Sequence, residues 1–463
     1  MYHDWEVWFL DKVASGTVEL DRILGGGFPS RSLILLSGNP GCGKTIMATR
    51  FLHYGATERG EKGVYVSFAE NREDYYNNMI QFGMNMKTLE EKGLFKFLDY
   101  PAMTNAGMRE ATTDILKTVM KFDAKRVVVD SLTAILQVLG PEESRTFLHM
   151  VFGKMVKNQG ITTIVIGEIP YGDSRTGFGM EEFVADGVII LRHVRGAALE
   201  KRILDIVKMR GVPVERSVFE YVIDIRYGGI GIINLPTRPA IGLASTEKLT
   251  TGIPGLDKML AGGFYRGSVT LIAGASGIGK TTLCLQLLVA NAKNGERALH
   301  LSFEEPVGQI RRTLKSYGLD SEKLGDKLII ESYVPEALTP LHYYTLIREQ
   351  VESNQPAILA LDTLTAVERT LSEEDFITFV RYLQLLCKEK SLTAIITTAS
   401  RTMAEATASG ISTLADNIIL MRFNEVEKMM TREMVVLKAR GTAHDREVKL
   451  FEIGDRGIVL SAT

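Results

Sequence analysis

Residues 38–45 read GNPGCGKT, and residues 274–281 read GASGIGKT. Both stretches fit the pattern G-x-x-x-x-G-K-[ST] of a phosphate-binding loop. In such a loop the glycines let backbone N–H groups converge on phosphate oxygens, the lysine reaches the β- and γ-phosphates, and the hydroxyl binds magnesium. Each stretch follows a short apolar run and precedes a run typical of a helix, which is the context that this loop requires. The sequence therefore predicts two nucleotide sites.

The pattern gives each loop residue a role. We expect the nucleotide to be bound by Gly38, Gly41, Gly43, Lys44 and Thr45 in the first loop, and by Gly274, Gly277, Gly279, Lys280, Thr281 and Thr282 in the second. Thr45 and Thr281 are also predicted magnesium ligands, because the hydroxyl that follows the lysine takes that role.

The rest of the chain repeats at the same long period. SGTVELD at 15–21 returns as TGIPGLD at 251–257, SFAE at 67–70 as SFEE at 302–305, VVDS at 128–131 as ALDT at 360–363, and KMRG at 208–211 as KARG at 438–441. The offset drifts only from 236 residues, between Lys44 and Lys280, to 230 residues, between Lys208 and Lys438. Such a repeat indicates two homologous units.

The repeat also predicts the domain boundaries. We expect an N-terminal domain over residues 1–235 and a C-terminal domain over residues 249–463. Residues 236–248 contain Pro236 and Pro239 and are the expected linker between them.

Short apolar runs without polar alternation recur in both halves. They cover residues 32–36, 64–68, 126–129 and 161–166, and then 269–273, 299–303, 358–361 and 393–397. Runs of this kind suit strands that are buried on both faces, as in the parallel sheet of an α/β domain. We therefore predict the α/β class, with two tandem phosphate-loop domains, each a mostly parallel twisted sheet flanked by helices.

Aspartates end two of these runs. Asp130 and Asp362 each follow a strand downstream of a phosphate loop, where the carboxyl end of a parallel strand meets the nucleotide. We expect both carboxylates to hold magnesium through water.

Glutamates end two other runs. In the second half, Glu304 and Glu305 stand where a carboxylate can orient or deprotonate a nucleophile near the γ-phosphate. In the first half Ala69 replaces the first of the pair and Glu70 remains. We expect the first half to hydrolyse its nucleotide more slowly, or to use Glu70 alone.

Composition argues against several other classes of protein. With 54 Lys+Arg and 56 Asp+Glu, the net charge of −2 gives no whole-molecule attraction to nucleic acid, and a local basic channel is the alternative that stays open. No apolar run approaches the roughly 18 residues that cross a bilayer, and acidic residues stand near the start where a secretory signal carries lysines. The three cysteines are too far apart in the sequence for a disulfide framework or a zinc cluster. We expect a cytoplasmic protein with no membrane attachment and no nucleic acid partner.

These motifs together resemble the KaiC family of tandem RecA-like ATPases. The similarity covers essentially the whole chain and includes TGIPGLD at 251–257, SFEE at 302–305, KARG at 438–441 with His444 and Asp445, and EEFVADGV at 181–188. The resemblance implies a RecA-like fold for each domain, ATP and magnesium as cofactors, and slow ATP hydrolysis. It also implies a homo-oligomer, namely a two-tiered hexamer with ATP at the subunit interfaces.

In that family the lysine and arginine of the K-x-R-G motif reach the nucleotide of the neighbouring subunit. The resemblance thus gives Lys208, Arg210, Lys438 and Arg440 a catalytic role in trans. This role agrees with the stabilisation of a transferring phosphoryl group by cations. Without the resemblance, these residues would be interpreted as surface charges at strand ends.

The second domain of that family also phosphorylates itself on an adjacent serine and threonine. Ser412 and Thr413 stand at the matching place, and by the family pattern Glu304 activates the hydroxyl. At the position of Ser412 the first half has Glu182, a fixed carboxylate. The resemblance therefore implies a serine/threonine autokinase, whose phosphate switches assembly or the binding of an unidentified signalling partner. The alternative is that both hydroxyls cap a helix or line a strand.

Two rival functions stay open from the sequence. A RecA-like recombinase or a hexameric helicase would share both loops, but would need basic and aromatic DNA-facing loops and an added DNA-binding module, neither of which is evident. A scaffold that uses ATP only to close its ring is favoured by Ala69. The sequence ends at Thr463 without the C-terminal tail that the family's clock protein presents to its activator, so the resemblance implies neither that regulation nor a clock role.

Overall fold

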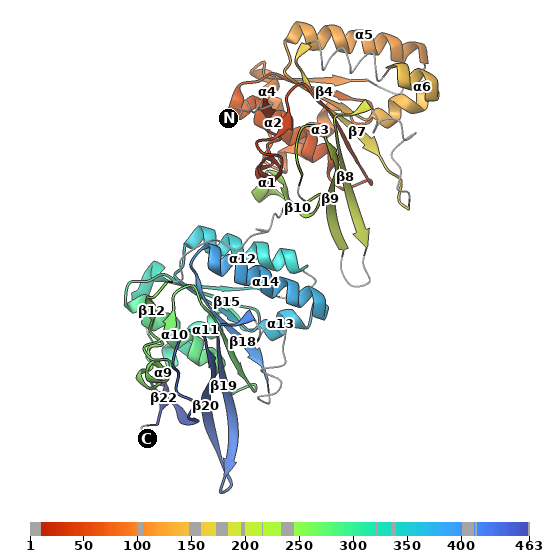
Figure 1. Ribbon diagram of the computed structural model, residues 1–463. Coiled ribbons are helices and arrows are strands. Elements are labelled where there is room, and N and C mark those ends of the chain that lie inside the picture. Colours follow the sequence, from red (N-terminus) through yellow and green to blue (C-terminus); the bar gives the residue numbers. More distant parts are fainter. Residues whose placement is uncertain are drawn as a thin grey trace, which may run out of the picture. The chain divides into compact units, whose positions relative to one another are not determined.

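The structure, a computed structural model, contains two compact units, Met1–Asn234 and Leu235–Thr463 (Figure 1). Each unit is built on one large sheet with helices packed against it. The residues that the structure describes are 11–100, 105–147, 159–172, 184–195, 200–214, 216–232, 245–319, 322–334, 339–400, 412 and 414–461.

The first unit has a nine-stranded sheet in the order β11-β10-β9-β8-β3-β7-β6-β4-β5. Its strands are β3 (Leu33–Gly38), β4 (Gly63–Ser67), β5 (Phe95–Asp99), β6 (Arg126–Asp130), β7 (Thr162–Glu168), β8 (Gly187–Arg195), β9 (Glu200–Met209), β10 (Val218–Asp224) and β11 (Gly229–Ile232). From β8 to β5 all neighbouring strands are parallel, whereas those from β8 to β11 pair antiparallel. A small separate sheet pairs β1 (Lys12–Val13) with β2 (Phe28–Pro29).

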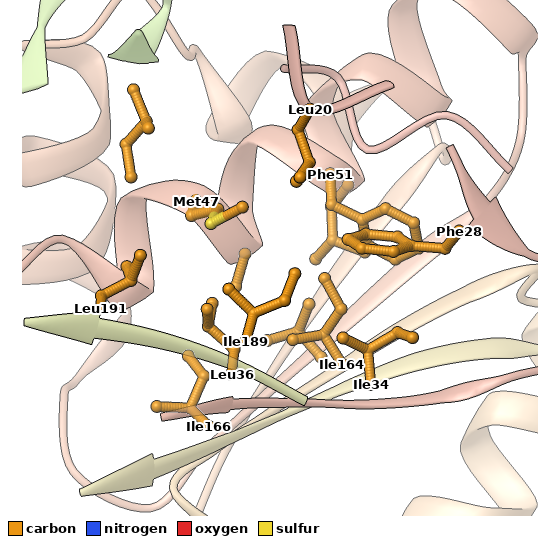
Figure 2. Close-up of a cluster of buried hydrophobic side chains, with 14 of the residues drawn as sticks. Leu20, Phe28, Ile34, Leu36, Met47, Phe51, Ile164, Ile166, Ile189 and Leu191 are labelled. Atoms are coloured by element: carbon orange, nitrogen blue, oxygen red, sulfur yellow. The ribbon is translucent and has the colours of Figure 1, made fainter. Parts of the chain in front are cut away.

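Helices cover both faces of this sheet. They are α1 (Val18–Ile23), α2 (Lys44–Arg59), α3 (Arg72–Ile80), α4 (Met86–Glu91), α5 (Asn105–Phe122) and α6 (Leu132–Phe147), with a 3₁₀ turn η2 (Ile225–Tyr227) near the end. Successive strand residues point to opposite faces. Ile34 and Leu36 therefore join a core with α2, α3 and α4, while Leu33 and Leu35 join a second core with α5 and α6. Figure 2 shows the first core, where α2 packs over β3, β7 and β8.

The second unit repeats this architecture. Its sheet has the order β16-β15-β17-β18-β14-β19-β20-β21-β22, which matches the first sheet strand for strand when that sheet is read from β5 to β11. The strands are β14 (Val269–Gly274), β15 (Ala298–Ser302), β16 (Leu328–Ser332), β17 (Ile358–Asp362), β18 (Thr393–Ala399), β19 (Asn417–Val426), β20 (Met429–Ala439), β21 (Lys449–Gly454) and β22 (Gly457–Leu460), with β12 (Lys248–Leu249) and β13 (Phe264–Tyr265) forming the small sheet.

The helices of the second unit also correspond to those of the first. They are α9 (Pro254–Met259), α10 (Lys280–Lys293), α11 (Val307–Ser316), α12 (Pro340–Asn354), α13 (Leu364–Glu368) and α14 (Glu373–Glu389), with a 3₁₀ turn η3 (Glu322–Lys327). α9, α10 and α11 share one core with the strands, and Figure 1 shows α12 and α14 on the opposite face of the sheet. Among the described helices none is long and apolar enough to span a membrane.

The predicted fold class is confirmed, because both units are mostly parallel sheets between helices. The apolar runs of the sequence form β3, β4, β6 and β7 in the first unit and the equivalent strands β14, β15, β17 and β18 in the second. All eight strands are largely buried. The units divide between Asn234 and Leu235. Residues 233–244, which include most of the expected linker, lie outside the described residues.

Candidate functional site

Each phosphate loop joins the central strand of its sheet to the amino end of a long helix. β3 ends at Gly38 and α2 begins at Lys44, while β14 ends at Gly274 and α10 begins at Lys280. The amino end of a helix presents unpaired N–H groups and the positive end of the helix dipole, which suit a phosphate group. Each unit therefore has one corner whose backbone suits an anion.

The last glycine of each loop is required by the backbone. Gly43 and Gly279 have φ angles of 93° and 113°, in the left-handed region that residues with side chains rarely adopt. A Cβ atom there would lie 2.9 Å from Cδ1 of Ile223 in the first unit and 2.6 Å from Cδ1 of Ile453 in the second. Glycine is thus needed both for the turn and for the packing beneath it.

The lysine of each loop folds back over the loop. Lys44 Nζ donates to the first two carbonyl oxygens of its loop, both at 2.9 Å, and to Oε2 of Glu168 at 3.2 Å. Lys280 Nζ donates to the corresponding two carbonyls at 2.8 and 2.9 Å. Both lysines are buried, and burial lowers the pKa of Lys280 although the carboxylates of Asp362 and Glu304 raise it. Among the described residues, Lys44 is paired with a carboxylate and Lys280 is not.

The two predicted magnesium ligands of the first unit are in contact. Thr45 Oγ1 donates a hydrogen bond of 3.0 Å to Oδ2 of Asp130, at the end of β6, and the hydroxyl of Tyr65 donates one of 2.6 Å to the same oxygen. Burial raises the pKa of Asp130, while these two hydrogen bonds favour its charged form and lower it. The loop and the strand-end carboxylate therefore form one cluster.

The second unit holds its strand-end aspartate differently. Asp362 is buried, and its Oδ1 accepts a hydrogen bond of 2.6 Å from Oγ1 of Thr397. His300 takes the place of Tyr65, with Nε2 3.9 Å from Oδ2 of Asp362, and its pKa is lowered by burial. Within the described residues neither ring nitrogen of His300 has a hydrogen-bond partner, and Thr281 does not hydrogen-bond to Asp362.

The strand-end glutamates lie beside these aspartates. Glu70 is half-buried and accepts from Nδ2 of Asn78 at 2.6 Å, and burial raises its pKa. In the second unit Glu304 is exposed, and its Oε2 accepts from Oγ1 of Thr363 at 3.3 Å. Burial, followed by the charges of Asp362 and Glu304, raises the pKa of Glu305. Each unit therefore gathers three carboxylates near its loop lysine, namely Asp130, Glu70 and Glu168 in the first and Asp362, Glu304 and Glu305 in the second.

Lys208 and Arg210 lie beside the amino ends of the parallel strands of the first sheet, whereas their own phosphate loop lies at the carboxyl ends. Asp186, which precedes β8, accepts a hydrogen bond of 3.1 Å from the backbone N–H of Leu33. Asp186 also forms an ion pair of 3.0 Å with Arg210. Lys208 Nζ donates to the carbonyl of Ala185 at 2.7 Å. Leu33 is the first residue of β3, and five residues of extended strand, about 16 Å, separate it from the loop at the far end. Neither side chain reaches that distance.

The second unit places Lys438 and Arg440 in the same way. The backbone N–H of Val269 donates to Asp416 at 3.0 Å, and Arg440 forms an ion pair of 3.4 Å with the same carboxylate. Lys438 Nζ donates to the carbonyls of Ala415 at 2.7 Å and Ser412 at 3.0 Å, and its pKa is lowered by burial and by the neighbouring Arg440. Figure 1 shows the two long hairpins, β8–β9 and β19–β20, whose bases carry these residues.

Ser412 is buried beside Lys438, at this same edge of the second sheet. Thr413 and Glu182 lie outside the described residues. The structure thus brings Lys44, Thr45 and Asp130 together, and gathers Glu304, Glu305 and Asp362, but it does not bring the K-x-R-G residues or Ser412 to the loop of their own unit.

Comparisons with known proteins agree with this duplicated architecture. The family model "ATPase: KaiC" matches residues 13–237 and again residues 249–463. The chain belongs to the KaiC family of ATPases. It is 33% identical to circadian clock oscillator protein KaiC of Thermostichus vulcanus, over 94% of the chain and 86% of that protein. It is 31% identical both to the protein of that name from Prochlorococcus marinus, over 97% of the chain and 92% of that protein, and to circadian clock protein KaiC3 of Synechocystis sp., over 98% and 92%.

The resemblance inferred from the motifs is therefore confirmed, and this KaiC-family chain is an ATPase with tandem domains. Sequence reasoning overlooked three of its residues. Glu168 ends the apolar run of β7 as Asp130 ends that of β6, so the rule used for Asp130 could have found it. Tyr65 and Tyr221 lie inside strands, and only the structure shows that the first bonds Asp130 and that the second donates to the carbonyl of Cys42 at 2.5 Å.

Proposed function

We propose that this KaiC-family chain binds Mg·ATP at both phosphate loops, hydrolyses it slowly, and completes each site with the K-x-R-G residues of an adjoining copy. The observation that carries the proposal is the placement of Arg210 and Arg440. Each lies at the opposite edge of its sheet from its own loop, about 16 Å away along the central strand, and is exposed. A cation in that position serves a phosphate only if the phosphate belongs to another copy.

A ring satisfies this requirement for every copy. In a head-to-tail interface the amino edge of one sheet faces the loop edge of the next, and such interfaces close into a ring when the rotation allows. The hexamer implied by the family is such a ring. Lysine and arginine brought to the γ-phosphate would stabilise the negative charge of the transferring group.

The donor sets fit magnesium. Thr45 and Asp130 are in contact at the base of the first loop, and Thr281 and Asp362 occupy the matching positions in the second. Hydroxyl and carboxylate oxygens suit this hard cation, which takes its remaining ligands from phosphate and water. Within the described ranges no three His, Cys, Asp or Glu residues gather as they would for a metal held wholly by protein. When bound, the ion would neutralise charge on the β- and γ-phosphates.

We propose that the second unit also phosphorylates Ser412 or Thr413. The hydroxyl oxygen would attack the γ-phosphorus, the bond to the β-phosphate oxygen would break, and ADP would leave while a carboxylate takes the hydroxyl proton. Glu304 is exposed at the end of β15, so it is available to accept a proton from another copy. Because Ser412 lies beside Lys438, its donor would be the ATP of a neighbour. Since Ser412 is buried in the isolated chain, transfer also requires this hydroxyl to become exposed at the interface.

The phosphate would bring close to two negative charges next to two cationic side chains. Lys438 and Arg440 lie at this edge, and a phosphate would compete there with Asp416 for Arg440. We propose that this competition switches the assembly, or its binding of a signalling protein, between two states.

Intact-mass measurement after incubation with Mg·ATP tests the transfer. We expect the parent chain to gain the mass of one phosphate, and the Ser412→Ala/Thr413→Ala double variant and the Lys280→Ala variant to gain none. The double variant leaves both loops intact and should still hydrolyse ATP. A parent chain that gains no mass refutes the autokinase and leaves the ATPase standing.

Native mass and nucleotide turnover test the rest. With ATP we expect a particle of about six times the 51.3 kDa chain. A monomer under these conditions refutes the trans role of the lysines and arginines. Hydrolysis that rises steeply on adding DNA at low salt would favour a recombinase or helicase, and nucleotide binding without turnover would favour a scaffold.

A further inference from the structure

We propose that Glu168 is a built-in counter-ion of the first phosphate site, which a nucleotide must displace from Lys44 before its β- and γ-phosphates can bind. The proposal rests on the proposed binding of ATP by the first half. It assigns to the two halves different affinities for ATP, and it attributes the difference to one carboxylate.

In the first site every N–H donor of the Lys44 ammonium group already has an acceptor. An ammonium group has three N–H donors. In the first site two of them bond to loop carbonyls at 2.9 Å, and the third bonds to Oε2 of Glu168 at 3.2 Å. Lys44 is 6% exposed and Glu168 is 39% exposed, so the carboxylate reaches the surface while the lysine that it pairs with is buried. All three donors are thus satisfied before any phosphate arrives.

The second site supplies an internal comparison. Glu168 pairs with Gly38 across β7 and β3, and Ala399 pairs with Gly274 across β18 and β14, so the two residues occupy the same place. Their backbone N–H groups are held alike, by Oγ1 of Thr133 at 2.8 Å and by Oγ1 of Thr365 at 2.7 Å. The backbone frame at this position is therefore the same, and the two positions differ in whether a carboxylate stands beside the loop lysine.

Lys280 accordingly has a donor to spare. Within the described residues its hydrogen-bond acceptors are the two loop carbonyls. Its remaining N–H can bond to a phosphate without displacing a protein group. The second site should therefore bind ATP more tightly than the first.

The carboxylate opposes the nucleotide in two ways. It competes for the lysine, and after displacement it stays near the phosphates as a like charge. Two unit charges about 4 Å apart near a protein surface interact strongly enough to change an equilibrium by tenfold or more. The lysine of such a loop contacts the β- and γ-phosphates. The effect should therefore apply to ATP and ADP and should leave AMP unchanged.

The test compares full-length chains in which the other site is silenced. Glu168→Gln is combined with Lys280→Ala, and ATP, ADP and AMP binding is measured by equilibrium dialysis without divalent cations. We expect ATP to bind about tenfold more tightly than to the Lys280→Ala parent, with AMP binding unchanged. A gain of affinity cannot come from partial unfolding, so the result does not depend on perfect stability of the variant.

The reciprocal variant adds the carboxylate to the second site. Ala399 is exposed, so Ala399→Glu has room for its side chain. Combined with Lys44→Ala, it should bind ATP about tenfold more weakly than the Lys44→Ala parent and should leave AMP binding unchanged.

Unchanged ATP affinity in both variants would overturn the counter-ion role while leaving ATP binding established. A Glu168→Gln chain that binds ATP as the parent does but hydrolyses it more slowly would also overturn it, because Glu168 would then act on the reaction. If the Lys280→Ala parent binds no ATP while the Lys44→Ala parent does, the first half is not a nucleotide site and the proposed function fails there too.

Discussion

Mixing two variants, each expected to be inactive in its second half, tests whether Arg440 acts on a neighbouring copy. Lys280→Ala removes the loop lysine of the second half and keeps Arg440, whereas Arg440→Ala does the reverse. If Arg440 serves the next copy, rings that contain both chains regain active sites. In a random one-to-one mixture about a quarter of the interfaces pair an intact Lys280 with an intact Arg440, because a ring interface is head-to-tail.

A catalytic role and a structural role of Arg440 predict different effects on the rate of hydrolysis and on the free energy of unfolding. Arg440 is 53% exposed, and its contact with Asp416 is 3.4 Å long. An exposed ion pair of this kind contributes about 0–1 kcal/mol. A cation that stabilises a transferring phosphoryl group is worth about 10³-fold in rate, which corresponds to about 4 kcal/mol. Arg440→Ala should therefore abolish turnover in the second half and hardly change the free energy of unfolding.

The assay is steady-state ATP hydrolysis, with the chains mixed before ATP is added so that rings form from both. The rate of Lys280→Ala chains alone gives the contribution of the first half and is subtracted. After this subtraction, we expect the mixture to show about a quarter of the rate that the second half of the parent chain contributes. If Arg440 served its own loop, every second-half site in the mixture would lack one of the two residues. No recovery, in mixtures shown by native mass to contain both chains, would therefore refute the trans assignment.

Three further substitutions probe the frame of the first half, each followed by urea unfolding and by ATP titration of chains that also carry Lys280→Ala. Tyr65→Phe removes the 2.6 Å hydrogen bond to the buried carboxylate of Asp130 and should destabilise the first unit by about 1–3 kcal/mol; an unchanged midpoint would mean that the hydroxyl is dispensable. Tyr221→Phe removes the 2.5 Å hydrogen bond to the carbonyl of Cys42, and we expect a loss of about 1 kcal/mol with weaker ATP binding at the first loop only. Arg126 is 1% exposed and bonds two backbone carbonyls as well as a glutamate, so Arg126→Met should cost about 3 kcal/mol without changing ATP affinity per folded chain. A loss below about 1 kcal/mol would contradict that interpretation of the buried guanidinium.

The parts of the fold that the sequence predicted are those fixed by local rules. The phosphate loops follow from glycines that must adopt positive φ and from a lysine at the helix start, and both are visible in eight residues. The strands follow from unbroken apolar runs, and Asp130 follows from its place at the end of one. Each of these features depends on residues that are close together in the chain.

The parts that escaped prediction depend on the order of the strands. Tyr65 and Asp130 are 65 residues apart, and Lys44 and Glu168 are 124 apart. They meet because β7 lies beside β3 and β4 lies beside β6, and apolar runs do not reveal which strand pairs with which. The position of Arg210 at the far edge of the sheet likewise follows from the antiparallel return of β9 along β8.

The two halves keep the contacts that hold the backbone and differ in side chains beside the loop lysine and the strand-end aspartate. Asp186 and Asp416 fasten the start of the central strand in the same way, and Thr133 and Thr365 fasten the end of the neighbouring strand. A change in those contacts leaves backbone N–H groups without partners, which costs stability in either half. Where the first half has Glu168 the second half has Ala399, and where the first has Tyr65 the second has His300. These differences alter the charge and hydrogen bonding at the site without disturbing the strands. These differences therefore cost the backbone little in either half, and under the proposed function they are the residues from which a ring with two kinds of ATP site would acquire its asymmetry.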